Sequence, residues 1–226
     1  VSGGFSTPND TPYEQQLNDS ELIGIISTAK ERNIPVTAHA YTAKIIKRLI
    51  SYGVSGIEHG SFIDDETAEL MVKNDVYLVP TFSPFDSILN LHQDELLKVP
   101  RGFREKLLIY SDALKRGRAT ISRSGIKLGY GSDFVSIHNN YESWREFKSW
   151  VNSGINPIKV LMAATSTNAE IVGNNEIGMI KKNKRADLAA WPKDLIDSPK
   201  LLEQCAFVMK DGLIYVDETN TISIHK

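Results

Sequence analysis

Four short runs of apolar and β-branched residues recur along the amino-terminal part of the chain. They cover residues 34–41, 54–60, 76–82 and 126–133, and turn-forming or polar residues bound each of them. Runs of this length and composition are typical of buried β-strands. The pattern therefore predicts four strands.

Between these strands, apolar residues recur with the three- and four-residue spacing of amphipathic helices. In residues 43–53, for example, four aliphatic side chains share one face and Gly53 ends the helix. Further helices are predicted for residues 21–33, 64–75, 102–124 and 141–152, another begins at Pro157, and a loop or lid is expected for residues 83–100. Alternating strands and helices indicate a parallel sheet with helices outside it.

The pattern changes after residue 183. Two strand-like runs, in residues 185–192 and 204–218, are not separated by a helix, and Lys210-Asp211-Gly212 is a hairpin turn signal within the second. We therefore expect two domains, an α/β domain over residues 1–183 and strands of a small β domain over residues 184–226.

Composition excludes several classes of protein. Of the 226 residues, 41% are hydrophobic and 24% charged, which is typical of a globular chain, and the net charge of −2 argues against a nucleic-acid partner. No apolar run is long enough to span a membrane, and Cys205 is the single cysteine, so a disulfide framework is excluded.

The chain opens on Val1 without an initiator Met, which suggests a piece of a longer protein. Nothing in the sequence demands export, so a cytoplasmic location is favoured.

Metal-ligand side chains stand at the carboxyl ends of three of the predicted strands. His39 and His59 are one strand–helix–strand unit apart, and Asp133 ends the fourth strand. Because function in parallel barrels gathers at these ends and neighbouring strands lie about 5 Å apart, one ion can be reached by both imidazoles. Two His and one Asp suit zinc or a similar ion, which would turn a bound water into a hydroxide nucleophile. Asp133 could take its proton, and alternation along the strand places Tyr41 on the same face as His39.

Each of these residues also has a plainer interpretation. A strand-end histidine is more often structural than a ligand, and Gly131-Ser132-Asp133 alone is only a turn or helix-cap signal. His138 follows the fourth strand, where an exposed loop residue is the ordinary expectation. Three further assignments are structural: His92 and His225 are surface residues, Trp144, Phe147 and Trp150 form a core-packing helix face, and Asp86 is more often a solvated charge than the partner of a cation.

Several motifs in order along the chain resemble the amidohydrolase superfamily. They are AHAYT, GIEHG, VPTF, GYGSDF followed by His138, MAATSTNAEIVG, the stretch from Ile177 to Ile180, and KRADLAAW. The set covers nearly the whole chain and is most similar to the prolidase-like branch, which includes zinc-dependent Xaa-Pro dipeptidases and arginine/lysine carboxypeptidases. The opening SGGFSTPND and the AHAYT run match that branch in particular.

The resemblance implies the second half of a (β/α)8 barrel, strands five to eight, followed by carboxyl-terminal strands of a small β-sandwich. By resemblance, His39 and His59 are the ligands of strands five and six, Asp133 is the strand-eight ligand and general base, and Tyr41 and His138 meet the substrate or its scissile carbonyl. One or two zinc ions, or another divalent metal, are implied. The family's HxH pair is absent from this chain, and its carboxylated lysine would fall just before Val1, outside it.

The expected function is hydrolysis of an amide bond in a dipeptide or N-acyl amino acid, with Xaa-Arg, Xaa-Lys and Xaa-Pro dipeptides as candidates. Hydrolysis of a cyclic amide, deamination, or a non-catalytic barrel acting as a scaffold are the alternatives that these residues leave open. The expected partners are a small-molecule substrate, further copies in a homo-oligomer and the remaining amino-terminal part of the same protein. Neither nucleic acid nor a membrane is expected as a partner.

Overall fold

The computed structural model describes the chain except for residues 6–8, 90–96, 98–100, 135–141, 197–198 and 219–226. The described residues form two compact units, Val1–Gly131 and Ser132–Lys226, and each is treated by itself. His92, His138 and His225 lie outside the described residues. The expected domain boundary at residues 183 and 184 stays a prediction about the whole protein.

The first unit is built on a parallel sheet with the order β1 (Thr37–Thr42), β2 (Gly56–Phe62) and β3 (Tyr77–Val79). The fourth predicted strand is reduced to one parallel bridge between Leu78 and Leu128. The Leu78 amide donates to the Lys127 carbonyl at 2.9 Å, and the Gly129 amide donates to the Leu78 carbonyl at 2.9 Å. The parallel sheet predicted from the sequence is thus confirmed, whereas a closed barrel stays a prediction.

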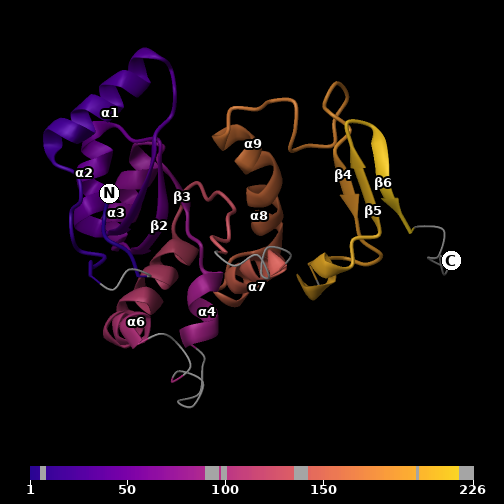
Figure 1. Ribbon diagram of the computed structural model, residues 1–226. Helices are drawn as coiled ribbons and strands as arrows, with labels where there is room; N and C mark the ends of the chain where they lie inside the picture. Colours follow the sequence, from indigo (N-terminus) through magenta and orange to yellow (C-terminus); the bar gives the residue numbers. More distant parts are fainter. Residues whose placement is uncertain (6–8, 90–96, 98–100, 135–141, 197–198, 219–226) are drawn as a thin grey trace. The chain divides into compact units, whose positions relative to one another are not determined.

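The helices of this unit are α1 (Asp19–Glu31), α2 (Ala43–Tyr52), α3 (Asp65–Lys73), α4 (Ser83–Leu89) and α6 (Arg101–Arg123). Figure 1 shows α2 and α3 together beside the sheet. Helix α2 buries Ile45, Ile46, Leu49 and Ile50 and ends at Gly53 in a left-handed conformation, as its spacing predicts. Helix α4 corrects the expectation of a loop, because residues 83–89 of the expected lid are helical.

Side-chain caps begin helices α1 and α3. At α1, the Asn18 side chain accepts a hydrogen bond from the Glu21 amide, and the Glu21 carboxylate accepts one from the Asn18 amide. At α3, Asp64 accepts from the Thr67 amide. Each cap satisfies amides that a helix start leaves without intrahelical partners.

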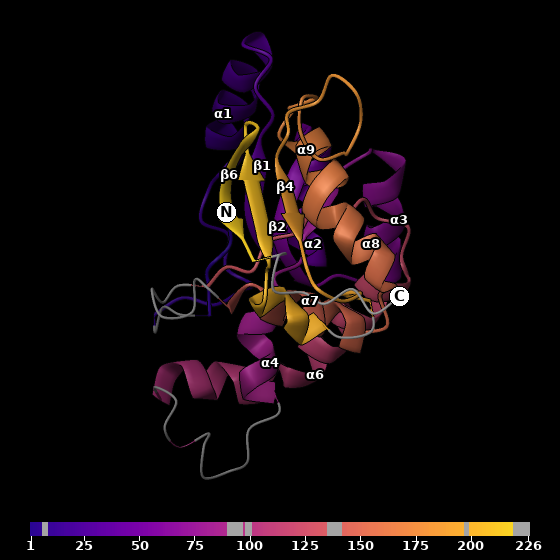
Figure 2. The same cartoon turned by 90° about the vertical axis from the view of Figure 1, so that its right-hand side faces the viewer.

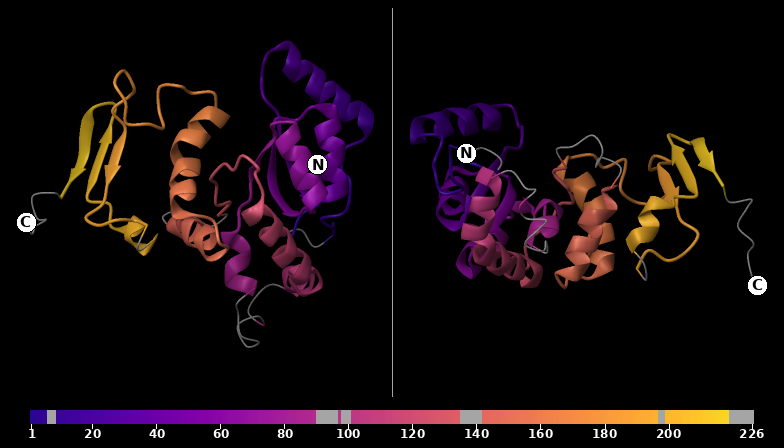
Figure 3. Two further views of the ribbon diagram at one scale, coloured as in Figure 1. Left: turned by 180° about the vertical axis from the view of Figure 1, so that it is seen from behind. Right: turned by 60° about the horizontal axis from the view of Figure 1, so that its bottom comes forward.

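The second unit contains a helical segment and an antiparallel sheet (Figures 2 and 3). Its helices are α7 (Trp144–Asn152), α8 (Pro157–Met162), η2 (Ala163–Thr167, a π-helix), α9 (Asn168–Ile171) and η3 (Pro199–Glu203). The predicted core-packing face of α7 is confirmed for Phe147 and Trp150, which are buried. Pro157 begins α8, as predicted, and the π-helix joins α8 to α9.

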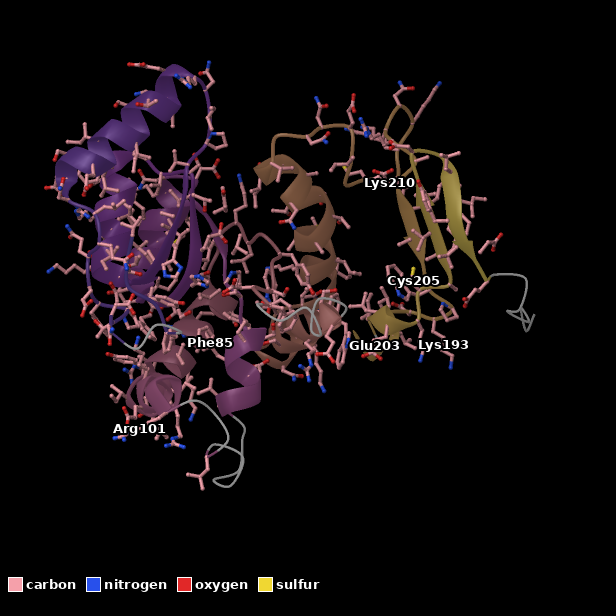
Figure 4. The ribbon with its side chains drawn as sticks, viewed as in Figure 1. Phe85, Arg101, Lys193, Glu203, Cys205 and Lys210 are labelled. Atoms are coloured by element: carbon pink, nitrogen blue, oxygen red, sulfur yellow. The ribbon has the colours of Figure 1, made fainter. Side chains whose placement is uncertain are left out.

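The antiparallel sheet has the order β4 (Leu188–Ala190), β5 (Phe207–Lys210) and β6 (Leu213–Asp217). Asp211 and Gly212 have φ of 50° and 78°, so the predicted hairpin turn has positive φ at both central positions. Figure 4 shows Lys210 at the turn and Cys205 near the opposite end of β5. The strands of the expected small β domain are present, and a second sheet that would complete a sandwich stays a prediction.

Candidate metal centre

The two histidines predicted as metal ligands meet at the ends of β1 and β2. His39 Nδ1 lies 2.9 Å from His59 Nε2, and the two ring centroids are 4.6 Å apart. His59 is buried, whereas His39 is half-buried on the sheet. The predicted convergence of these two imidazoles is therefore present in the structure.

Regular strand geometry alone would not bring these rings together. In the parallel register, His39 is opposite Glu58 and Ala40 is opposite His59. Residues opposite each other share a face, and Glu58 does accept a hydrogen bond from Thr37 Oγ1 at 2.8 Å on the His39 face. His59 has φ of 75° and Gly60 has φ of 58°, so the backbone departs from alternation at this point. We attribute the orientation of the His59 side chain toward His39 to the left-handed backbone conformation of His59 and Gly60.

The other ring nitrogen of His59 has a partner on the next strand end. His59 Nδ1 lies 2.7 Å from Thr81 Oγ1, and Thr81 is buried. In the tautomer whose Nδ1–H donates to Thr81, the Nε2 lone pair faces His39 and is available to a metal ion. A metal-ligating histidine commonly uses its second nitrogen in this way, and the partner fixes the ring orientation. Sequence reasoning missed Thr81, although it stands at a strand end within the VPTF motif.

Aromatic rings enclose the histidine pair on one side. The Tyr41 ring stacks on His59 with centroids 4.8 Å apart and planes 10° apart, and its edge meets His39. Tyr41 also belongs to a buried cluster with Phe5 and with Phe85, which Figure 4 labels on α4. Only 4% of Tyr41 is exposed, so its ring serves the packing of the site. Its expected contact with substrate stays a prediction.

Burial changes the protonation of His59. Desolvation of the ring, with a smaller contribution from the charge of His39, lowers the pKa of His59 to about 3. The imidazole is therefore neutral at neutral pH, as a metal ligand must be. Two nitrogens about 2.0–2.1 Å from one ion are roughly 2.9 Å apart at a right angle and about 3.3 Å apart at a tetrahedral angle. The observed 2.9 Å falls within this range, so both nitrogens fit one divalent ion after a small ring movement.

The pKa of His59 predicts a pH-dependent stability for the metal-free protein. Between about pH 6.5 and 3 the unfolded state binds a proton that the folded state excludes, so stability falls as the pH falls through this window. From pH 7 to pH 5, we expect the free energy of unfolding to drop by about 2 kcal/mol from this group alone. Urea unfolding of the metal-free protein at both pH values measures the drop. The His59→Leu variant should lose this part of the pH dependence, and an unchanged slope would contradict the assignment.

The other predicted site residues are less fully described. Asp133 belongs to the second unit, where it is exposed and has φ of 50°. His138 lies outside the described residues. Among the residues that the structure describes, no third His, Cys, Asp or Glu joins the histidines in a potential metal-binding group. The roles of Asp133 and His138 therefore stay predictions.

Comparison with known proteins identifies the family. The sequence profile of the amidohydrolase family matches residues 5–216. The chain belongs to the amidohydrolase family. The resemblance inferred from the motifs is confirmed, because the family profile matches and solved structures of a Xaa-Pro dipeptidase and a prolidase are similar to this chain.

Several members of the amidohydrolase family are similar to this chain. The ochratoxinase of Aspergillus niger is 25% identical over 221 residues, which are 95% of this chain and 45% of that protein. A Xaa-Pro dipeptidase crystallised with methionine in its active site superimposes with a TM-score of 0.84 at 30% identity, covering 96% of this chain and 53% of that one. A prolidase complexed with N-methylphosphonate-L-proline has a TM-score of 0.83 at 27% identity, with the same coverage.

The chain spans about half the length of the relatives that it matches. The similarity to these relatives supports an amidohydrolase-type α/β fold for the part present. None of the helices in the described ranges is long and apolar enough to cross a membrane.

Proposed function

We propose that the chain is the carboxyl-terminal part of a metal-dependent hydrolase that cleaves an amide bond in a dipeptide or an N-acyl amino acid. The observation that carries the proposal is the approach of His39 Nδ1 and His59 Nε2 to 2.9 Å at the ends of adjacent parallel strands. Membership of the amidohydrolase family and similarity to a Xaa-Pro dipeptidase support the same chemistry.

In this proposal His39 and His59 bind a divalent ion, for which zinc suits imidazole nitrogen. Such an ion would polarise the substrate carbonyl and lower the pKa of a water molecule. Thr81 holds the His59 ring with Nε2 turned toward His39. The buried aromatic rings around Tyr41 exclude water from one side of the pair, which strengthens electrostatic interactions there.

Asp133 is proposed as a third ligand and as the general base that takes a proton from water and passes it to the leaving nitrogen. His138 is proposed to assist the developing oxyanion, and Tyr41 to hold a substrate carboxylate. These roles come from the family resemblance, and each residue is assigned by the motif in which it occurs: AHAYT for Tyr41, and GYGSDF with the following histidine for the other two.

A carboxylated lysine preceding Val1 is also part of the proposal. The Val1 nitrogen donates to the His39 carbonyl at 3.1 Å, and the Ser2 amide donates to the same oxygen at 3.4 Å. A residue just before Val1 in a longer chain would therefore enter the structure beside the His39 end of β1. This is where a lysine that bridges two ions is expected by resemblance.

A substrate panel tests the proposed reaction. We expect the full-length protein to contain divalent metal by elemental analysis and to hydrolyse at least one of the Xaa-Pro, Xaa-Arg and Xaa-Lys dipeptides, with loss of activity on metal removal and recovery on adding zinc. Hydrolysis of cyclic amides or deamination without dipeptide cleavage would replace the proposed reaction by another amidohydrolase reaction. A metal-free protein that is inactive on the whole panel would favour a scaffold.

A further inference from the structure

The bond between His59 and Thr81 joins two residues in an unusual backbone conformation. His59 has φ of 75° and Thr81 has φ of 47°. Positive φ is disfavoured for residues with a side chain, most of all for a β-branched one such as threonine. Such conformations persist only where the surrounding structure imposes them. The elements that impose them therefore also set the His59–Thr81 bond.

Arg118 of α6 binds the segment that begins at Thr81. Its Nη2 donates to the Phe82 carbonyl at 2.9 Å, and its guanidinium lies over the Phe82 ring, 4.6 Å from the centroid. Its Nη1 pairs with Asp86. The ion pair is only partly exposed, with 20% of the Arg118 side chain and 27% of the Asp86 side chain accessible. A planar guanidinium makes these three contacts together, whereas a lysine ammonium cannot.

Gly117, the preceding residue of α6, touches the other strand end. A Cβ atom at Gly117 would come within 1.9 Å of the Ser61 carbonyl oxygen and 2.7 Å of its carbonyl carbon. Ser61 follows His59 by two residues on β2 and is buried. Only glycine allows the helix to approach β2 this closely. Two consecutive residues of α6 thus contact the backbone just beyond each partner of the His59–Thr81 bond.

We propose that Gly117 and Arg118 of α6 are positioning residues that hold the His59–Thr81 hydrogen bond and thereby aim His59 Nε2 at the metal. The inference rests on the proposed function for its metal, but the hydrogen bond itself is defined without one. Asp86 takes part through its ion pair with Arg118, which corrects the expectation that it is a solvated charge. The alternative is that α6 merely packs against the strand ends and that His59 keeps its orientation without it.

The test compares Arg118→Met and Arg118→Lys with Arg123→Met as the control. Arg123 lies on the same helix and also pairs with an aspartate, Asp65, but 57% of its side chain is exposed. Its hydrogen bonds within the described part of the chain go to Asp65 and Thr120, away from the ends of β2 and β3. Histidine ring ¹⁵N NMR of the full-length metal-free protein reads the tautomer of His59, whose signals are assigned by their loss in His59→Asn. Metal affinity is measured by competition with a chelator.

In the wild type and in Arg123→Met we expect one His59 tautomer, with the proton on Nδ1. In Arg118→Met we expect a mixture of tautomers and a 10- to 100-fold weaker metal affinity, the size reported for lost partners of metal-ligating histidines. Arg118→Lys should restore little of either property, although it keeps the charge facing Asp86. Gly117→Ala should also give mixed tautomers.

Wild-type tautomer signals in a folded Arg118→Met protein would overturn the inference, even if the enzyme hydrolyses dipeptides. Mixed tautomers in that variant would uphold it, even if the wild type proved inactive on every substrate. Circular dichroism and thermal unfolding establish that each variant is folded. If Arg118→Met fails to fold, Arg118→Lys and Gly117→Ala decide in the same way.

Discussion

Replacing His59 with asparagine is expected to release the bound metal and to lower kcat/KM of the full-length protein by at least about 10³-fold, because a ligand and the chemistry that depends on it are lost. Asparagine is chosen because it tolerates positive φ, and His59 has φ of 75°. Elemental analysis and steady-state kinetics on the best dipeptide of the panel measure the two effects.

A folded His59→Asn protein that keeps its metal and its turnover would identify His59 as a structural histidine. Circular dichroism should show native secondary structure, because the substitution preserves the backbone preference. The thermal midpoint should fall, since the Tyr41 ring loses the imidazole on which it stacks. A fall in stability without loss of metal would also contradict the ligand role.

Replacing Asp133 with asparagine is expected to lower kcat by about 10²–10⁴-fold while metal remains bound. Asparagine keeps the size of the side chain and can still bind metal through its oxygen, but it cannot accept the proton from water. It also tolerates φ of 50°, the conformation of Asp133. The measurement is a single-turnover rate together with the metal content.

Asp75→Asn provides a matched control for this variant. Asp75 has φ of 51°, nearly that of Asp133, and its carboxylate pairs with Lys127 at 2.8 Å on the surface. The substitution removes the same charge in the same backbone conformation, so we expect no change in kcat. Near-normal turnover in Asp133→Asn would refute the role of Asp133 as general base.

Much of the fold follows from local sequence signals. The α2 face, the Gly53 terminus, the Asn18 cap and the Asp211-Gly212 turn appear where spacing and turn chemistry predict them. The fourth predicted strand is shorter than its sequence indicates. Within the described residues, this glycine-rich run forms one isolated parallel bridge to β3, between Leu128 and Leu78. Helix α4 was missed because a polar, proline-containing start reads as a loop. Tertiary packing of Phe85 decides that segment instead.

The candidate metal site was predictable only in part. The 20-residue spacing of His39 and His59 predicts that they lie on adjacent strand ends, and the two rings do meet in the structure. Thr81 and Arg118 could not be found in this way, since their contacts join residues 22 and 36 positions apart through side chains and backbone. No periodic pattern in the sequence encodes such contacts. The residue types alone, a threonine and an arginine, have too many other uses.

The left-handed backbone at His59 and Gly60 also limits how this site could be transplanted. A protein engineer who copied only the two imidazoles onto a regular parallel sheet would place them on opposite faces, because His39 is opposite Glu58 and His59 is opposite Ala40 in the register. The kink would have to be grafted together with the ligands. In this protein, therefore, the direction of the His59 side chain depends on the backbone conformation of His59 and Gly60.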